Sequence, residues 1–282
     1  MKVRRKKGSL VHRIIIYLLL LFFVGILLFP LFYSFINSFK ASGEALAGMH
    51  FWPEQWKWQN YLEAWDKANF ATYTKNTVMY AFAITVLCVL SDSICGYVFA
   101  RGKFPGKKLI LAMKSSMMFI AFGSVIMFPQ MQILQKLHLT NIPGLVIVAV
   151  SSGSIAYIYM VRAFVLSLPK ELDEAATIDG CSFMGVFFRI TLPLIKPIVA
   201  TIAVLYFKYA WNDYLFPMIV TFGAPEKRTL SVGLYTLQTA TVSANWGLML
   251  AGSMIAAVPL IIIYAFLNRF FLESIAEGAV KG

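Results

Sequence analysis

The chain has 282 residues, of which 59% are hydrophobic and 13% are charged, and its formal net charge is +12. Its mean hydropathy is +0.72. About a quarter of the residues of an ordinary soluble domain are charged, so this composition excludes that class and indicates a membrane protein. A basic chain could also bind nucleic acid, but the distribution of its charges, described below, favours a membrane topology instead.

Six hydrophobic runs are long enough to cross a bilayer as helices, which takes about 20 residues each. They cover residues 14–36, 77–100, 109–131, 144–164, 194–218 and 246–267. Strands of a membrane barrel would be shorter and would alternate between apolar and polar residues. The sequence therefore predicts an all-α membrane protein with six transmembrane helices, which together form one transmembrane domain over residues 14–268.

The basic residues lie mainly on one side of these predicted spans. With the N-terminus inside, the segments on that side carry more than twice as many Lys and Arg residues as the segments outside. Cytoplasmic loops are enriched in Lys and Arg, so we expect both the basic N-terminal segment, residues 1–13, and the tail, residues 269–282, in the cytoplasm. The first apolar run is also longer than a secretory signal core of roughly 7–15 residues, which predicts an uncleaved first span.

The longest outer segment, residues 38–76, is rich in tryptophan. Its tryptophans are Trp52, Trp56, Trp58 and Trp65. Because such rings prefer the membrane interface, the segment is expected to form short helices there. Anchoring at the interface and docking of a solute-binding protein are both compatible with this composition.

Asp92, Lys114 and Lys208 fall inside predicted spans, where charges usually face the interior of a helix bundle or a cavity. Lys114 lies close to the cytoplasmic end of the third span, so its ammonium is expected to reach the cytoplasm. Asp92 and Lys208 lie deeper, at depths that differ by roughly 9 Å. Two interpretations stay open for them: a structural ion pair, or a path for an acidic or hydroxyl-rich solute that Lys208 lines.

The three cysteines predict neither a disulfide nor a metal site. Cys88 and Cys95 are about 10 Å apart along one predicted helix, which is too far to bridge. Cys181 falls in a loop, and no His or Cys spacing typical of metal ligands is present.

A charged, amphipathic segment, residues 169–193, separates the fourth and fifth predicted spans. Pro169 suits the start of a helix, and the carboxylates of Glu171, Asp173 and Glu174 suit its positive end. Gly180 permits a sharp turn before a second amphipathic stretch, residues 183–189. The segment therefore predicts a short helix at the membrane surface with a low apolar face that meets a soluble partner. The residues of that face are Leu172, Ala175, Ala176 and Phe183.

The same segment carries a pattern of fixed residues at fixed spacing. It reads Glu174-Ala175-Ala176, three residues, Gly180, nine residues, then Ile190-x-Leu192-Pro193. This pattern resembles the signature cytoplasmic loop of permease subunits of bacterial ABC importers, and every fixed position is filled. Asn60-Tyr61, the stretch Trp-Asn-Asp-Tyr-Leu-Phe-Pro at residues 211–217 and the terminal Gly-Ala-Val-Lys-Gly extend the resemblance. Over nearly its whole length the chain resembles the maltose-type, carbohydrate-uptake family of such permeases, and within it the shorter of two paired subunits.

The resemblance implies that the loop couples the chain to an ATPase. The residues implied to carry this coupling are Glu174, Ala175, Ala176, Asp179, Gly180, Ile190, Leu192 and Pro193. It also implies a multi-pass protein of the bacterial inner membrane, with a second, different permease subunit, two ATPase subunits and an extracytoplasmic solute-binding protein as partners. The sequence has no phosphate-loop motif. ATP and Mg²⁺ are therefore expected on the ATPase partners, and this chain is expected to need no cofactor of its own.

The fifth predicted span is rich in aromatic residues, which suit the ring faces of sugars. Lys208, Trp211 and Asn212 are three and four residues apart, so they are expected to share a helix face and to line the translocation path. Asp213 and Asp92 complete the predicted path residues. The predicted solute is a carbohydrate, with an oligosaccharide favoured. An acidic sugar polymer or glycerol phosphate is the alternative that Lys208 suggests.

A membrane-embedded enzyme is the alternative from another class of function. The sequence has no His-rich metal set, no paired carboxylates and no motif of a nucleophile with its base, so no catalytic residue is predicted. The sequence therefore favours a transporter subunit.

Overall fold

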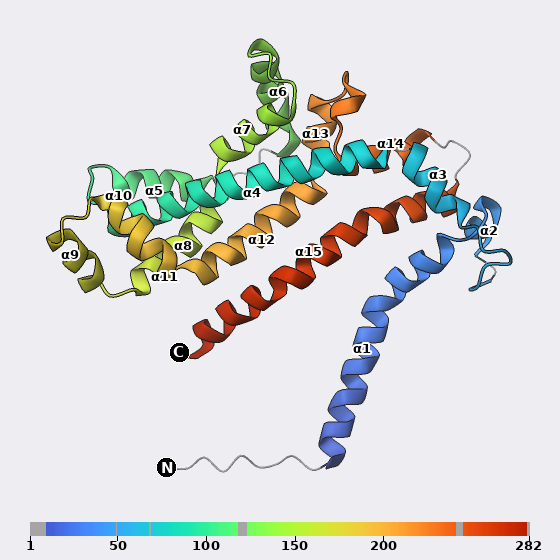
Figure 1. Ribbon diagram of the computed structural model, residues 1–282, viewed down its shortest axis with the longest axis horizontal. Coiled ribbons are helices and arrows are strands. Elements are labelled where there is room, and N and C mark those ends of the chain that lie inside the picture. Colours follow the sequence, from blue (N-terminus) through green and yellow to red (C-terminus); the bar gives the residue numbers. More distant parts are fainter. Residues whose placement is uncertain (1–9, 49, 68, 118–122, 241–244, 281–282) are drawn as a thin grey trace. The chain divides into compact units, whose positions relative to one another are not determined.

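A computed structural model describes residues 10–48, 50–67, 69–117, 123–240 and 245–280. In these residues all regular structure is helical, as predicted (Figure 1). Three helices are each long and apolar enough to cross a membrane, and up to five spans result if each of two bent helix pairs is one span. The chain divides into two compact units, Met1–Ala68 with Thr236–Ala256, and Asn69–Tyr235 with Ala257–Gly282.

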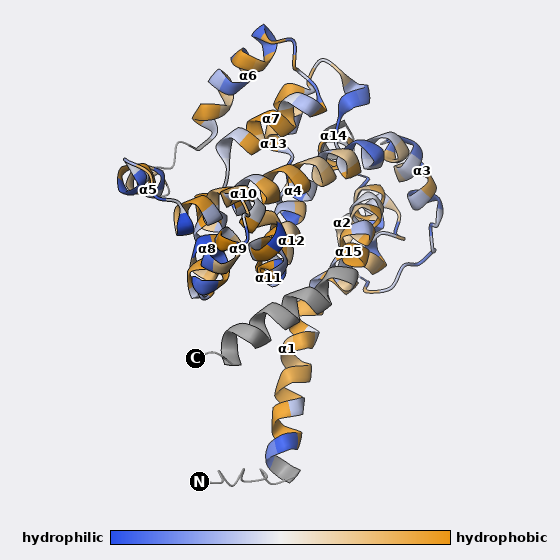
Figure 2. Cartoon of the chain, turned by 60° about the vertical axis from the view of Figure 1, so that its left-hand side comes forward, coloured by the Kyte–Doolittle hydropathy of each residue, from blue (hydrophilic) through white to orange (hydrophobic). Residues whose placement is uncertain are grey.

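The first unit contains α1 (Leu10–Asn37), α2 (Ser42–Ala47), α3 (Gln59–Lys67) and the beginning of α15 (Trp246–Val280). The side chains of α1 from His12 to Phe32 are exposed. Figure 2 shows that α1 is hydrophobic along most of its length and hydrophilic near its N-terminal end. An apolar helix without a covering layer suits a hydrocarbon environment better than water.

The loop between α1 and α2 is fixed by a side chain of α3. The Asn60 side-chain amide donates to the carbonyl oxygens of Ser38 and Lys40, at 2.8 and 3.0 Å. Gly247 of α15 leaves room for the same backbone, since a Cβ there would lie 2.2 Å from the carbonyl oxygen of Lys40. The short helices predicted for residues 38–76 are therefore present, and Asn60 holds their loop in place.

The second unit contains the remaining helices. They are α4 (Phe70–Arg101), α5 (Lys107–Ser116), the 3₁₀ turn η1 (Gly123–Ile126), α6 (Met127–Lys136), α7 (Ile142–Ser152), α8 (Ile155–Ser167), α9 (Glu171–Ile178), α10 (Phe183–Val186), the π-helical turn η2 (Phe187–Thr191), α11 (Leu192–Leu194), α12 (Lys196–Asn212), α13 (Leu215–Val220), the 3₁₀ turn η3 (Pro225–Lys227), the beginning of α14 (Leu230–Ala240) and the end of α15.

The central helix of this unit is α4, against which α12, α8 and α7 pack (Figure 1). Gly96 allows α8 to approach α4 closely. A Cβ at this position would lie 2.7 Å from Cβ of Val161 and 3.0 Å from the carbonyl oxygen of Ile158. Small residues permit such close helix contacts, which are a main source of packing energy inside a membrane. Close packing at Gly96 therefore holds α8 against α4.

Three predicted spans are not single straight helices. For residues 109–131, α5 ends at Ser116, residues 118–122 lie outside the described part, and η1 then leads into α6. The fourth span is bent by 54° between α7 and α8, at Gly153, whose φ is +54°. In the fifth, α12 ends at Asn212 and the separate helix α13 follows, while Phe183–Leu194 meets α12 at 83°.

The last helix, α15, continues through residue 268 to Val280, so no break separates the predicted tail from the last span. The six-span count and the cytoplasmic location of both termini stay predictions.

Candidate functional site

The charged segment between the fourth and fifth predicted spans contains a short helix, α9. Its first turn carries Glu171, Asp173 and Glu174, whose carboxylates lie near the positive end of the helix dipole. Gly180 ends the helix with φ +85°, in the left-handed region that favours glycine. The amides of Gly180 and Cys181 donate to the carbonyl oxygens of Thr177 and Ala176, at 3.0 and 2.9 Å. The predicted turn at Gly180 is therefore present.

A buried arginine at the end of α4 fixes α9. Nε of Arg101 lies 2.5 Å from Oδ2 of Asp173, and Nη2 donates to the carbonyl oxygen of Leu168 at 2.9 Å. The Arg101 side chain is only 8% exposed. Planar guanidinium groups suit such paired recognition of a carboxylate and a carbonyl. In the sequence, Arg101 is only one of the basic residues on the predicted cytoplasmic side, and nothing in its sequence neighbourhood indicates this contact.

A tyrosine one turn before Arg101 holds the second half of the loop. The Tyr97 hydroxyl donates to the carbonyl oxygen of Phe183 at 3.3 Å. Its ring packs against the rings of Phe183 and Phe187, with centroids 4.7 and 5.2 Å apart. Both helical parts of the loop are thus attached to the same end of α4.

A groove of about 760 Å³ lies between α9 and the end of α4. Basic side chains from both sides line it, among them Arg101, Lys107 and Lys170. Burial, and then the nearby charge of Arg162, lower the pKa of the Lys107 ammonium, which donates to the carbonyl oxygen of Gly102 at 2.9 Å.

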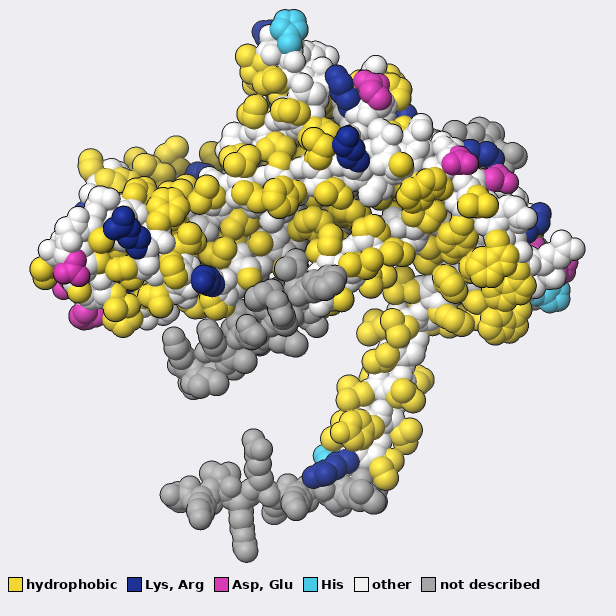
Figure 3. Space-filling model, in the orientation of Figure 1, with side chains coloured by type: hydrophobic (Ala, Val, Ile, Leu, Met, Phe, Trp, Pro, Cys, Tyr) yellow, Lys and Arg dark blue, Asp and Glu magenta, His cyan; other side chains and the backbone are white. Residues whose placement is uncertain are grey.

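The predicted coupling residues divide into exposed and buried ones. The exposed residues are Glu174, Ala175, Asp179, Gly180 and Pro193, while Ile190 and Leu192 are half-buried. Ala176 is 4% exposed, so the expectation that it meets a partner is wrong. It lies one helical residue, about 100°, from exposed Ala175 and faces the chain's own core. Ile178, which the sequence analysis did not select, is 86% exposed and extends the exposed surface of α9. In Figure 3, acidic side chains gather at the α9 end of the unit.

The second half of the loop is less regular than predicted. The stretch 183–189 is divided between α10 and the π-helical turn η2, in which the amide of Leu192 donates to the carbonyl oxygen of Phe187. Pro193 follows directly in α11. Such wide turns are often found at functional positions of helices. Here the turn redirects the chain between the loop and α12.

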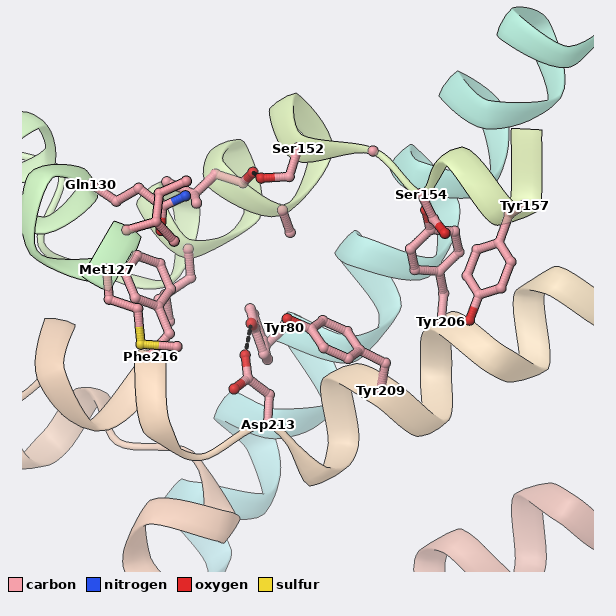
Figure 4. Close-up of a pocket in the computed structure, with 15 residues that line it drawn as sticks. Tyr80, Met127, Gln130, Ser152, Ser154, Tyr157, Tyr206, Tyr209, Asp213 and Phe216 are labelled. Carbon is pink, nitrogen blue, oxygen red and sulfur yellow. Dashed lines mark hydrogen bonds between the residues drawn. The ribbon is translucent and has the colours of Figure 1, made fainter. Parts of the chain in front are cut away.

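A cavity of about 360 Å³ lies beside the break between α7 and α8 (Figure 4). Its walls come from α4, α6, α7, α8, α12 and α13, and four tyrosines line it: Tyr80, Tyr157, Tyr206 and Tyr209. Asp213, directly after α12, also lines it, and its Oδ2 accepts a hydrogen bond from the Tyr80 hydroxyl at 2.8 Å. We call this space the tyrosine cavity.

Asp92 lies behind the wall of this cavity and is buried. Its Oδ2 accepts hydrogen bonds from the Tyr206 hydroxyl and from the backbone amide of Ser154. The proposed ion pair between Asp92 and Lys208 is therefore wrong. A cation, Lys114, lies close to Asp92: a Cβ at Gly153 would lie 3.4 Å from Oδ1 of Asp92 and 3.9 Å from Nζ of Lys114. The expectation that Lys114 reaches the cytoplasm is not met, because its ammonium is directed toward this buried carboxylate.

The remaining predicted path residues do not reach the tyrosine cavity. Lys208 is exposed and lines a separate, apolar groove with Leu260, Ile261 and Tyr264. Trp211 is 4% exposed and stacks on Phe207, with ring centroids 5.5 Å apart. Lys208 and Asn212 are exposed and Trp211 is buried, so the three side chains do not form one exposed stripe along the helix.

The side chain of Asn212 donates back to the carbonyl oxygen of Lys208 at 2.8 Å, within its own helix. Of the five predicted path residues, only Asp213 lines the cavity, and Asp92 supports its wall. None of the four cavity tyrosines was among the path residues predicted from the sequence. Tyr80 and Tyr157 come from helices distant along the chain, and Tyr206 and Tyr209 belong to the aromatic fifth span, from which only Lys208, Trp211, Asn212 and Asp213 were predicted to line the path.

The sequence of residues 2–273 matches the family described as binding-protein-dependent transport system inner membrane component. The chain belongs to this family. It is 34% identical to the arabinooligosaccharides transport system permease protein of Halalkalibacterium halodurans, over 93% of this chain and 94% of that protein. It is 30% identical to the diacetylchitobiose uptake system permease protein of Streptomyces coelicolor, over 93% and 87% of the two chains.

A solved structure has the same fold. It is a chain of a bacterial ABC transporter involved in the import of the acidic polysaccharide alginate, with a TM-score of 0.78 and 22% identity, covering 96% of this chain and 100% of that chain. The family match confirms the resemblance predicted from the sequence. The protein is an inner-membrane transport component, and its general kind is a transporter subunit rather than an enzyme.

Proposed function

We propose that this chain is one of two different permease subunits of a bacterial ABC importer for an oligosaccharide. It crosses the inner membrane six times with both termini in the cytoplasm and forms half of the translocation path. The observation that carries the proposal is the attachment of the loop: its fixed pattern begins on α9, an exposed acidic helix that Arg101 fixes to the long helix α4, and ends in η2 and α11. Relatives named for transport of arabinooligosaccharides and diacetylchitobiose support the choice of solute.

The loop has two connections to the walls of the tyrosine cavity. Through Arg101 and Tyr97 it holds α4, which contributes Tyr80 to the cavity. Through η2 and α11 it continues directly into α12, which contributes Tyr206 and Tyr209. A displacement of α9 by an ATPase therefore moves two walls of the cavity together, since packed helices transmit displacement as units.

The other parts of the importer supply what this chain lacks. Two ATPase subunits bind ATP and Mg²⁺ and contact the exposed surface of α9. A second permease completes the path, and an extracytoplasmic binding protein delivers the solute.

The test is ATP hydrolysis by the complete importer in proteoliposomes. We expect hydrolysis to rise when the binding protein is loaded with an oligosaccharide, and we expect Glu174→Lys to abolish this rise while the chain still inserts. A matched control is Glu63→Gln, which removes an exposed carboxylate that pairs with Lys67 within α3, and which should leave the rise unchanged. Normal coupling in Glu174→Lys would contradict the role of α9. Hydrolysis that no carbohydrate stimulates would contradict the proposed solute.

A further inference from the structure

We infer that the tyrosine cavity is a solute subsite that accepts neutral, hydroxyl-rich sugars and disfavours acidic ones. This inference rests on the proposed function and adds the charge class of the solute. It is carried by the composition of the cavity wall, by the position of Asp213 and by the position of Lys208.

The wall of the cavity has the chemistry that sugar rings require. The Tyr209 side chain is 56% exposed, and Tyr157 meets Tyr206 edge-on with ring centroids 4.8 Å apart. Aromatic faces pack on the apolar faces of pyranose rings, while phenol groups and the side chains of Ser152 and Gln130 can exchange hydrogen bonds with hydroxyls. A pocket of about 360 Å³ has room for one or two sugar rings.

Asp213 is the only charged residue among those that line the cavity in the described part of the chain. Its hydrogen-bond donors, the Tyr80 phenol and the backbone amide of Phe216, are both neutral, and no described Lys or Arg lies within ion-pair distance of it. A uronate carboxylate placed here would meet another carboxylate and no cation, and like charges repel strongly when water is excluded. A sugar hydroxyl can instead donate to the carboxylate, and hydrogen bonds to a charged acceptor are among the stronger ones.

The second carboxylate near the cavity does not change this conclusion. Asp92 is covered by Tyr206 and lies close to Lys114, so the two opposite charges largely offset each other. Lys208, the residue that suggested an acidic solute, lines the separate apolar groove with α15. The cation that suggested a uronate or a phosphate from the sequence is therefore outside the subsite.

The experiment measures the charge of the cavity directly, in the assembled importer. The background is a variant in which Cys88, Cys95 and Cys181 are changed to alanine. In this variant a single cysteine replaces Ser152, because Ser152 lines the cavity and is exposed. Rates of modification are compared for a trimethylammonium and a sulfonate methanethiosulfonate of similar size. We expect the cationic reagent to react faster, and Asp213→Asn to reduce the ratio of the two rates by about threefold or more. Lys208→Met should leave the ratio unchanged.

Protection experiments then test the ligand. A neutral oligosaccharide should slow modification of the Ser152→Cys importer, and an oligouronate of the same length should not. Gln130→Cys serves as a second position if Ser152→Cys does not assemble. Three results would each overturn the subsite: equal rates for the two reagents, reaction of either cysteine variant only after the protein is unfolded, or equal protection by the uronate. If oligosaccharides stimulate ATP hydrolysis by the importer but one of these three results is found, the proposed function stands and only this inference fails.

Discussion

Arg101 shows how a single side chain can hold a loop at the end of a long helix. Its guanidinium meets the carboxylate of Asp173 in α9 and the carbonyl oxygen of Leu168 just before that helix. One contact lies in the first turn of α9 and the other just before the helix begins. The pair therefore sets the position of the exposed surface of α9, the proposed contact with the ATPase, relative to α4.

Arg101→Ala is expected to uncouple the importer rather than to prevent insertion. The change leaves the Asp173 carboxylate without its partner, at a cost of about 1–2 kcal/mol, less than for a fully buried pair because Asp173 reaches solvent. Uptake per ATP hydrolysed should fall, and the Arg101→Asp, Asp173→Arg double variant should recover part of it. Lys108→Gln, which removes a nearby exposed charge, is the control. Unchanged coupling in Arg101→Ala would show that the pair is dispensable.

At the scale of helices, the sequence predicts features that depend on residues close together along the chain, but it does not predict features that depend on how the helices pack. The turn at Gly180 and the long helices α1 and α4 follow from local residues and from hydrophobic run length. The break at Gly153 does not, because a glycine between serines is equally compatible with a straight span. The tyrosine cavity escapes prediction for a different reason: Tyr80, Tyr157 and Tyr209 come together only when α4, α8 and α12 pack.

The contact between α4 and α8 depends on Gly96, and Gly96→Leu should weaken it. The added side chain would overlap Val161 and the backbone of Ile158, so α8 would have to move, at a cost of about 2 kcal/mol. Thermal unfolding of the purified complex should shift to lower temperature. The matched control is Gly25→Leu in α1, where a Cβ has no neighbour within 4 Å. Equal stability of the two variants would argue against tight packing at Gly96.

At the scale of the whole molecule, one end of the second unit carries α9 and the tyrosine cavity lies beside the break between α7 and α8. Two continuous structures join them, α4 through Arg101 and α12 through η2. An importer needs such a connection, because the ATP is hydrolysed outside the membrane-embedded chain and the solute moves within it. The geometry of the turn at Gly180 decides whether a displacement of α9 is passed to α10 and η2.

Gly180→Ala should therefore uncouple transport from ATP hydrolysis by more than its loss of stability explains. Gly180 has φ +85° and Gly106, before α5, has φ +77°, and a Cβ at either position has no neighbour within 4 Å. Alanine should thus cost each site about 1 kcal/mol of backbone strain without a clash. Both variants should unfold at similarly lowered temperatures, but only Gly180→Ala should reduce the ATP hydrolysis that a loaded binding protein stimulates. If Gly106→Ala reduces it equally, the loss follows from lowered stability, and the turn after α9 has no special part in coupling.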